Sequence, residues 1–263
     1  MGEVIVITSG KGGVGKTTTT ANIGTALAKI DKKVVLVDTD IGLRNLDVVL
    51  GLENRIVYDI VDVVKGHCRL NQALIKDKRL EGLFLLPAAQ TKDKNAVTEE
   101  EIKKLTEDLK EKFDYVIMDC PAGIEQGFKN AIIGADRAIV VATPEVSSVR
   151  DADRIIGLLE ANEIPDTRLV INRLRPQMVK QGDMMDIEDI IDILSIKLIG
   201  VIPEDEFIIV STNRGEPAVN NEDSMAGKAY MNTAKRIVGE EVPFLNLEVQ
   251  EGLLDRFLKI FSK

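Results

Sequence analysis

Residues 3–18 read EVIVITSGKGGVGKTT, an apolar, β-branched run that leads directly into a glycine-rich loop. The loop satisfies the pattern G-x-x-x-x-G-K-[ST], which between a strand and a helix is the phosphate-binding loop. Its glycines let successive backbone N–H groups face inward, and the positive end of the following helix adds to the attraction for a polyphosphate. We expect Lys16 to contact the β and γ phosphates, Thr17 to give its hydroxyl to magnesium and Thr18 to reach the α phosphate. The predicted nucleotide loop is Gly10, Lys11, Gly12, Gly13, Val14, Gly15, Lys16, Thr17 and Thr18.

Further short apolar runs follow along the chain, and they are typical of buried strands. They lie at 33–40, 83–88, 115–121, 138–144, 169–173 and 197–203, and stretches of helical period lie at 16–29, 98–112, 149–162 and 187–194. The polar stretch 87–101 indicates a surface loop that opens a helix at Thr98. Strands that alternate with helices imply a parallel sheet covered on both faces. We therefore predict an α/β fold, a doubly wound, mostly parallel sheet of about seven or eight strands, in one domain over residues 1–247.

Acidic residues close two of the predicted strands, where ligands of an open α/β sheet usually bind. Asp119 ends the run 115–119 and is the expected Walker B carboxylate, which holds magnesium directly or through water. Of the two aspartates after the second strand, we expect Asp38 to serve the metal and Asp40 to orient the attacking water. The alternative, that one of this pair only stabilises the loop, stays open. The predicted metal ligands are Thr17, Asp38 and Asp119.

Composition narrows the class of protein. Lys and Arg total 34 against 43 Asp and Glu, a net charge of -9, which does not favour long-range attraction to nucleic acid. Cys68 and Cys120 lie 52 positions apart and show no paired spacing, which disfavours a zinc ribbon and a disulfide framework, and we expect no metal role for them or for His67. No apolar run reaches the roughly 18 residues of a membrane span, and the N-terminus lacks the pattern of a secretion signal. These features predict a protein of the reducing cytoplasm.

Residues 248–263 are expected to form a C-terminal amphipathic helix. At about 100° per residue the apolar side chains fall on one arc, while Asp255, Arg256, Lys259 and Lys263 fill the opposite side. An apolar face opposite basic residues is typical of a helix that lies in an anionic membrane interface, and a terminal helix docked on the body of the protein is the alternative. One short helix binds weakly, whereas two held in a dimer add their binding energies. The expected membrane residues are Leu253, Leu254, Phe257, Leu258, Ile260, Phe261, Arg256 and Lys259.

The lysine at position 11 goes beyond the general motif, because KGGVGKT resembles the deviant Walker A sequence of the ParA/MinD family of P-loop ATPases. Further stretches narrow the resemblance to the septum-site-determining branch of that family, and the resemblance covers almost the whole chain. These stretches are TDIGLRNLDVVLGLENRIVYDIVDV (39–63), LPAAQTKDK (86–94), DCPAGIE (119–125), PEVSSVRDADRIIGLL (144–159), GVIPED (200–205) and NRGEPAV (213–219).

The resemblance implies an enzyme that hydrolyses ATP to ADP and phosphate with ATP and Mg²⁺ bound. In the family, ATP holds a homodimer in which the lysine matching Lys11 reaches the partner's nucleotide, so the implied catalytic residues are Lys11, Lys16 and Asp40. Residues 38–44 match switch I and residues 119–125 match switch II. The adenine contacts carry over to Asn172, Pro203, Glu204 and Asp205. Taken alone, those four residues serve equally well as turn formers.

The family's partners and output are implied in the same way. Its partners are the division inhibitor MinC and MinE or another topological partner. Their binding region carries over to the helical residues around and after PEVSSVRDADR (144–154), which include Asp151 and Asp153. The sequence alone makes these two aspartates solvated helix charges. The resemblance implies an ATPase that cycles from the cytoplasm to the inner face of the cell membrane and recruits MinC there. This recruitment would control where the septum and its FtsZ ring form.

Two other functions share the same loop. A ParA-like DNA-partition ATPase would bind DNA through basic surface residues, but the acidic balance and the amphipathic tail weigh against it, and we expect no specific nucleic acid. An iron–sulfur carrier of the nitrogenase iron-protein type would bridge a cluster with cysteines. The distance in sequence between Cys68 and Cys120 weighs against that function.

Overall fold

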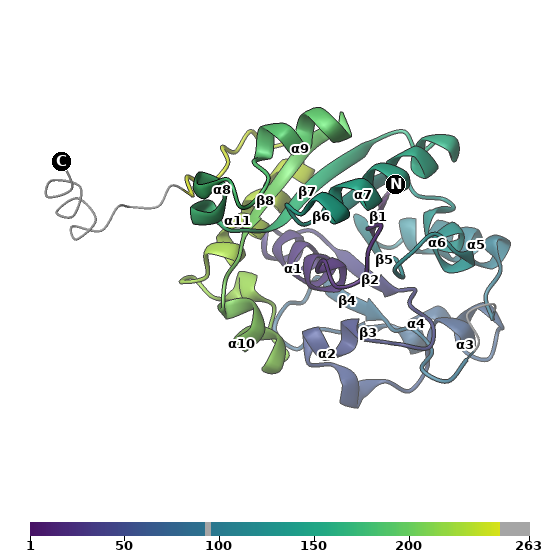
Figure 1. Ribbon diagram of the computed structural model, residues 1–263. Helices are drawn as coiled ribbons and strands as arrows, with labels where there is room; N and C mark the ends of the chain where they lie inside the picture. The colour runs from purple at the N-terminus through teal and green to yellow at the C-terminus, as the bar shows by residue number, and fades with distance from the viewer. Residues whose placement is uncertain (93–95, 248–263) are drawn as a thin grey trace, which may run out of the picture.

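The computed structural model describes residues 1–92 and 96–247 of the chain. Within that part, eight strands form one sheet in the order β3-β4-β2-β5-β1-β6-β7-β8 (Figure 1). Neighbouring strands are parallel except β3 and β4, which pair antiparallel. The strands are β1 (Glu3–Thr8), β2 (Val34–Asp38), β3 (Ile75–Lys76), β4 (Leu83–Leu86), β5 (Tyr115–Asp119), β6 (Arg137–Ala142), β7 (Thr167–Leu174) and β8 (Lys197–Pro203).

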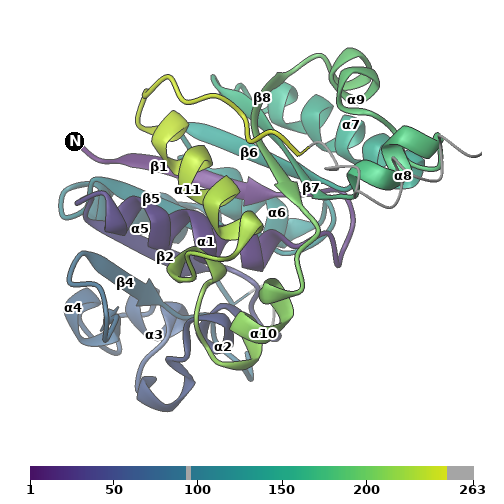
Figure 2. The same ribbon diagram turned by 90° about the vertical axis from the view of Figure 1, so that its left-hand side faces the viewer.

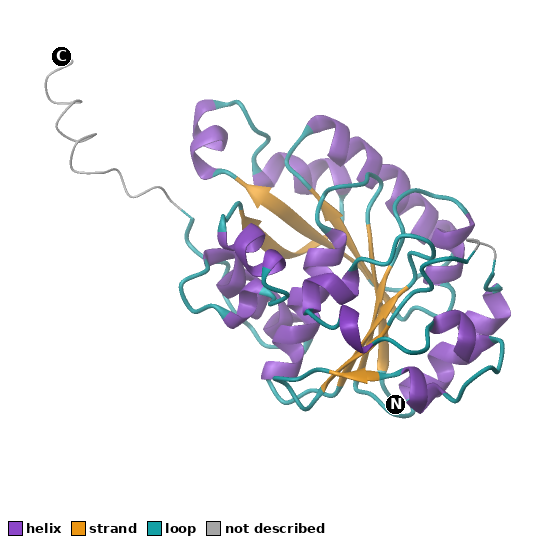
Figure 3. Cartoon of the chain, turned by 90° about the horizontal axis from the view of Figure 1, so that it is seen from below, coloured by secondary structure: helices purple, strands orange, loops and turns teal. Residues whose placement is uncertain are grey.

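Helices cover both faces of this sheet, which confirms the predicted doubly wound α/β fold (Figures 1 and 3). Two short 3₁₀ turns, Glu53–Arg55 and Ala218–Asn220, complete the regular structure of the described residues. The helices are α1 (Lys16–Lys29), α2 (Leu46–Leu50), α3 (Ile60–Val64), α4 (Leu70–Ala73), α5 (Glu99–Lys110), α6 (Gln126–Ile132), α7 (Val146–Ala161), α8 (Pro176–Gln181), α9 (Ile187–Leu194), α10 (Phe207–Asn213) and α11 (Met225–Ile237).

Alternate residues of the central strand enter two separate cores. Ile5 and Ile7 of β1 pack in one core with side chains of α1, α2 and α11, and α1 and α11 lie side by side in front of the sheet in Figure 2. Val4 and Val6 pack with side chains of α5, α6, α7 and α9 on the other face. A strand buried on both faces has no polar side, which explains why the strand runs in this sequence are almost continuously apolar.

Several predicted boundaries agree with the structure. The helices predicted at 16–29 and 187–194 are α1 and α9, residue for residue. Thr98 opens α5 as predicted: its Oγ1 accepts the Glu101 N–H at 3.3 Å, and the Glu101 carboxylate accepts the Thr98 N–H at 2.9 Å. The prediction at 149–162 is displaced, because α7 begins at Val146, whose exposed side chain lies outside the apolar period that marked the helix.

Several short elements escaped the sequence analysis, and the helix α11 and the strand β3 are two of them. The helix α11 has the sequence MAGKAYMNTAKRI, in which small residues rather than a leucine stripe form the buried face against α1. The strand β3 has two residues and depends on its pairing with β4. Neither segment carries a local pattern strong enough to stand out.

The predicted membrane helix, residues 248–263, lies outside the described residues. Over 1–92 and 96–247 the structure contains no helix that is both long and apolar enough to span a membrane.

Candidate nucleotide and metal site

The glycine loop lies between β1, near the centre of the sheet, and α1. The N-terminus of α1 has no side-chain cap, because Gly15 stands at the capping position, and the first turn contains no acidic residue. The helix α5, in contrast, is capped by Thr98 and has three glutamates in its first turn. An open helix N-terminus leaves N–H donors and positive potential for an anion. Lys16 begins this helix with only 8% of its surface exposed.

Gly15 is required at its position by both conformation and space. Its φ is 96°, a left-handed conformation that costs other residues roughly 1–2 kcal/mol. A Cβ at Gly15 would lie 2.4 Å from Nδ2 of Asn172. That amide donates to the Val14 carbonyl at 2.8 Å, so Asn172 of β7 braces the glycine loop from the side.

Asp38 and Asp119 end two adjacent parallel strands and are paired in register. Both carboxylates are buried. Asp119 Oδ1 accepts the Thr20 hydroxyl at 3.0 Å, and the Thr17 hydroxyl also bonds this carboxylate. Asp38 accepts the backbone N–H of Asp40 at 3.0 Å and those of Asn45 and Leu46 at 3.3 Å. Asp38 therefore organises the loop that starts α2.

Burial is the main cause of the altered acidity of this pair. It raises the pKa of Asp119 to about 6, against the hydrogen bond from Thr17 and the charge of Lys16. Burial and the Asp119 charge raise the pKa of Asp38 to about 7, against three backbone hydrogen bonds. Two adjacent buried carboxylates resist ionisation unless a cation compensates them.

The residues around Asp119 fit a magnesium ion. A carboxylate and the Thr17 hydroxyl are hard oxygen donors, and Mg²⁺ takes one or two such protein ligands while phosphates and water supply the rest. Among the described residues there is no cluster of three or more His, Cys, Asp or Glu side chains that could hold a metal ion. Asp40 is close enough for its charge to raise the pKa of Asp119.

A cavity of about 240 Å³ opens beside the glycine loop. A β-bulge between Ile171 and Leu174 interrupts the pairing of β7 with β8 and re-aims Asn172 towards the loop. Arg173, inside the bulge, has a positive φ of 59°. This cavity is lined by all four of the residues that were predicted to contact adenine, together with Gly15 and Thr18 of the glycine loop. Sequence analysis missed the other lining residues, which are Arg173, Glu206, Ile208, Ile209 and Tyr230.

Asp205 and Glu204 have partners within the protein. Asp205 Oδ2 accepts the Ser224 hydroxyl at 2.8 Å and the Ala226 N–H at 3.0 Å at the start of α11. Glu204 accepts Arg175 Nε at 2.7 Å, and this hydrogen bond lowers the pKa of Glu204. Both carboxylates therefore shape the cavity wall, and Asp205 ties it to α11.

Lys11 does not point into its own nucleotide site. Its Nζ lies 3.8 Å from the Glu145 carboxylate and 3.5 Å from the Ser147 hydroxyl, and its side chain is 47% exposed. It thus contacts the first residues of α7, the helix that also carries Asp151 and the exposed Asp153.

The two cysteines lie in unlike places. Cys120 is buried behind Asp119, and burial raises the pKa of its thiol to about 12, which disfavours the thiolate needed to bind iron or zinc. Burial also raises the pKa of Cys68, which is only partly buried.

A parallel sheet with a glycine loop after β1, an open helix N-terminus behind it and an acidic strand end beside it defines a P-loop nucleotide-binding protein. Residues 5–218 match the CobQ/CobB/MinD/ParA nucleotide-binding domain. The septum site-determining protein MinD of Bacillus subtilis is 61% identical, over 100% of this chain and 99% of its own length. MinD of Helicobacter pylori is 51% identical, over 100% of both chains.

Solved structures agree. The chain is similar to one in the MinC:MinD cell division protein complex of Aquifex aeolicus, with a TM-score of 0.88, 53% identity and coverage of 93% of this chain and 98% of that one. MinD of Pyrococcus horikoshii with Mg-ADP has a TM-score of 0.82 and 30% identity, over 90% and 96% of the two chains. The chain belongs to the MinD/ParA family of nucleotide-binding ATPases and, within it, to the septum-site-determining MinD proteins, which act in placing the division site.

Proposed function

We propose that this chain is an ATP-hydrolysing switch that pairs two copies on ATP, joins an anionic membrane through residues 248–263 and recruits a MinC-type division inhibitor to control septum placement. In this proposal residues 1–247 form the ATPase domain. The resting form lies in the cytoplasm, and the ATP-bound dimer lies on the inner face of the cell membrane.

The observation that carries the proposal is the unequal placement of the two loop lysines. Lys16 is buried at the start of α1, whereas Lys11 is half exposed and turned towards Glu145 and Ser147. A lysine in a phosphate loop that does not serve its own pocket is available to a nucleotide held by a second copy. Its exposed contacts are weak enough to exchange for a phosphate.

The chemistry follows from the same geometry. Lys16, the loop N–H groups and the α1 terminus would hold the phosphates, while Thr17 and Asp119 would hold Mg²⁺, with Asp38 as a further ligand. Magnesium would supply positive charge that neutralises the β and γ oxygens during transfer. Asp40 would orient the attacking water, and its backbone N–H is already fixed by the Asp38 carboxylate. The cavity beside Asn172 and 203–205 would take the adenine.

The membrane and partner roles rest on different support. The full-length similarity to MinD proteins includes the amphipathic segment. The Aquifex MinC:MinD structure supports a MinC-type partner, and we propose the exposed face of α7, with Asp153, as the surface for MinC and for MinE or another topological partner.

Replacing Lys11 tests the dimer step. Lys11→Ala should bind Mg-ATP as the wild-type chain does, because Lys11 lies outside its own pocket, and should remain a monomer with hydrolysis reduced at least about tenfold. Light scattering with and without ATP gives the mass, and fluorescent-nucleotide titration gives the affinity. The matched Lys16→Ala variant should lose nucleotide binding itself. An ATP-dependent dimer of Lys11→Ala would contradict the role in trans.

The DNA-partition alternative has weaker support. ParA-type structures, such as that from Chlorobium tepidum at 23% identity and a TM-score of 0.76, share the fold. A DNA mobility shift that requires Mg-ATP and collapses with salt would favour this alternative.

A further inference from the structure

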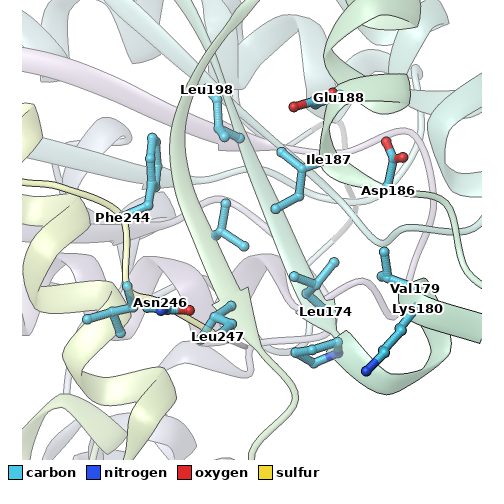
Figure 4. A pocket seen from close by; sticks show the side chains of 13 residues that line it. Leu174, Val179, Lys180, Asp186, Ile187, Glu188, Leu198, Phe244, Asn246 and Leu247 are labelled. Carbon is cyan, nitrogen blue, oxygen red and sulfur yellow. The ribbon is translucent and has the colours of Figure 1, made fainter. Parts of the chain in front are cut away.

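An apolar groove lies at the β8 edge of the sheet, on the face covered by α7 and α9. Its volume is about 850 Å³, and it shares no lining residue with the cavity beside the glycine loop. Its walls are formed by the end of β7, by Leu198 and Val201 of β8, by α8, by the start of α9 and by residues 244–247 (Figure 4). The apolar lining includes Leu174, Val179, Ile187, Leu198, Val201 and Leu247.

The described chain ends inside this groove. After α11, Arg236 fixes the chain to the outer edge of β8 by donating to the carbonyls of Val242 and Pro243 at 2.8 Å and of Ile199 at 2.9 Å. Leu245 then packs against the core under α1 and α11, and Leu247 packs against the opposite core. The described chain therefore crosses the edge of the sheet and ends at Leu247 on the groove side.

The residues that follow in the sequence can reach the groove and carry an apolar pattern that suits it. Leu253 follows Leu247 by six positions, which allow a reach of about 20 Å, and a helix over 253–263 would be about 16 Å long. Its apolar arc would otherwise face water whenever no membrane is present.

The charges also match. Asp186 and Glu188 lie beside Ile187 at one side of the groove, and Lys180 also lines it (Figure 4). The side of the tail opposite its apolar arc carries Arg256 and Lys259. Carboxylates beside an apolar groove complement a basic amphipathic helix.

We propose that this groove holds the apolar face of residues 253–261 of the same chain when no membrane is present. Because it assigns the lipid-free position of the membrane segment, this inference rests on the proposed function. The groove and the lipid surface compete for one apolar face, so a single tail stays docked. In an ATP-bound dimer the two tails are linked, so binding of one to the membrane raises the effective concentration of the other there, and membrane binding is favoured over the groove.

Tryptophan fluorescence gives a direct test, because the chain contains no tryptophan. Phe257→Trp places one reporter in the tail of the full-length protein. Without lipid or nucleotide, its emission should lie at shorter wavelength than that of a peptide of residues 248–263 with the same substitution. Adding Ile187→Asn, in the groove, should shift the emission to the peptide's value. Ile193→Asn is the matched control, since Ile193 lies on the same helix, is 52% exposed and is outside the groove.

Three results would overturn the proposal: emission equal to that of the peptide, emission insensitive to Ile187→Asn, and a short-wavelength emission that is lost on dilution. The last would place the tail on a second copy. If Ile187→Asn unfolds the protein by circular dichroism, Val179→Asn replaces it as the groove variant.

Vesicles containing anionic lipid separate this inference from the proposed function. In the otherwise unmodified chain, Ile187→Asn should raise sedimentation without nucleotide several-fold, while Ile193→Asn should not. If neither the wild-type chain nor its variants sediment with ATP, the membrane function fails, whereas the emission result still decides whether the groove holds the tail.

Discussion

At the scale of single residues, the Asp119 carboxylate is buried, which favours its neutral form, whereas the magnesium binding that we propose for it requires the charged form. Its pKa is raised to about 6 from an ordinary 3.8, so the folded protein without metal binds a proton more strongly than the unfolded chain. Stability from this group is therefore full below about pH 4 and is lost as pH rises through about 6. Conversely, magnesium requires the ionised form, so metal affinity should rise over the same interval.

The substitution Asp119→Asn separates these two effects. Without nucleotide, the variant should be more stable than the wild-type chain at pH 8, by up to about 3 kcal/mol in the free energy of unfolding. Its thermal midpoint should therefore be higher at pH 8, and the difference should vanish near pH 4. Magnesium should no longer strengthen ATP binding. Thermal unfolding at both pH values and nucleotide titration with and without Mg²⁺ measure this. An equal stability difference at both pH values would refute the assigned burial effect.

Gly15 offers a steric test at the same scale. Gly15→Ala meets both a left-handed backbone and the Asn172 amide, so the nucleotide-free protein should lose about 1–3 kcal/mol of stability. Gly12→Ala is the control, because an added Cβ there meets only Ala122, at 3.8 Å. Urea unfolding compares the two variants, and equal losses would show that Gly15 is not specifically constrained.

At the scale of elements, the segment after β8 is held by α11 through Asp205. Asp205→Ala should cost about 1–3 kcal/mol, because the Ser224 hydroxyl and the Ala226 N–H lose their acceptor. A double-mutant cycle with Ser224→Ala, measured by urea unfolding, should give a coupling of at least about 0.5 kcal/mol. If no coupling is found and ATP binding is weaker, Asp205 contacts the adenine and does not merely hold the cavity wall in place.

The same scale explains what the sequence could predict. The glycine loop and the Thr98 cap are local patterns, in which each residue acts within a few positions, and both appear in the structure as expected. The pairing of Asp38 with Asp119 depends on β2 lying beside β5, and the direction of Asn172 depends on a bulge against β8. Tyr230 of α11 reaches the cavity beside the glycine loop, and the mostly small buried residues of this helix gave no pattern. These features depend on strand order and packing between distant segments, which the sequence does not display locally.

At the scale of the whole molecule, we propose that the nucleotide site and residues 248–263 act together. The candidate nucleotide site lies at the carboxyl ends of the central strands, and the described chain ends at the β8 edge after crossing from one core to the other. ATP acts on the tail by pairing two chains, so membrane binding should follow the dimer and not nucleotide occupancy alone.

Sedimentation with anionic vesicles tests this central claim most directly. The wild-type chain should sediment with Mg-ATP and remain in solution with ADP or without nucleotide, and Lys16→Ala, Lys11→Ala and a deletion of 252–263 should each abolish the ATP-dependent fraction. ATP-dependent binding that survives the deletion, or binding by the Lys11→Ala monomer equal to the wild type, would contradict the account.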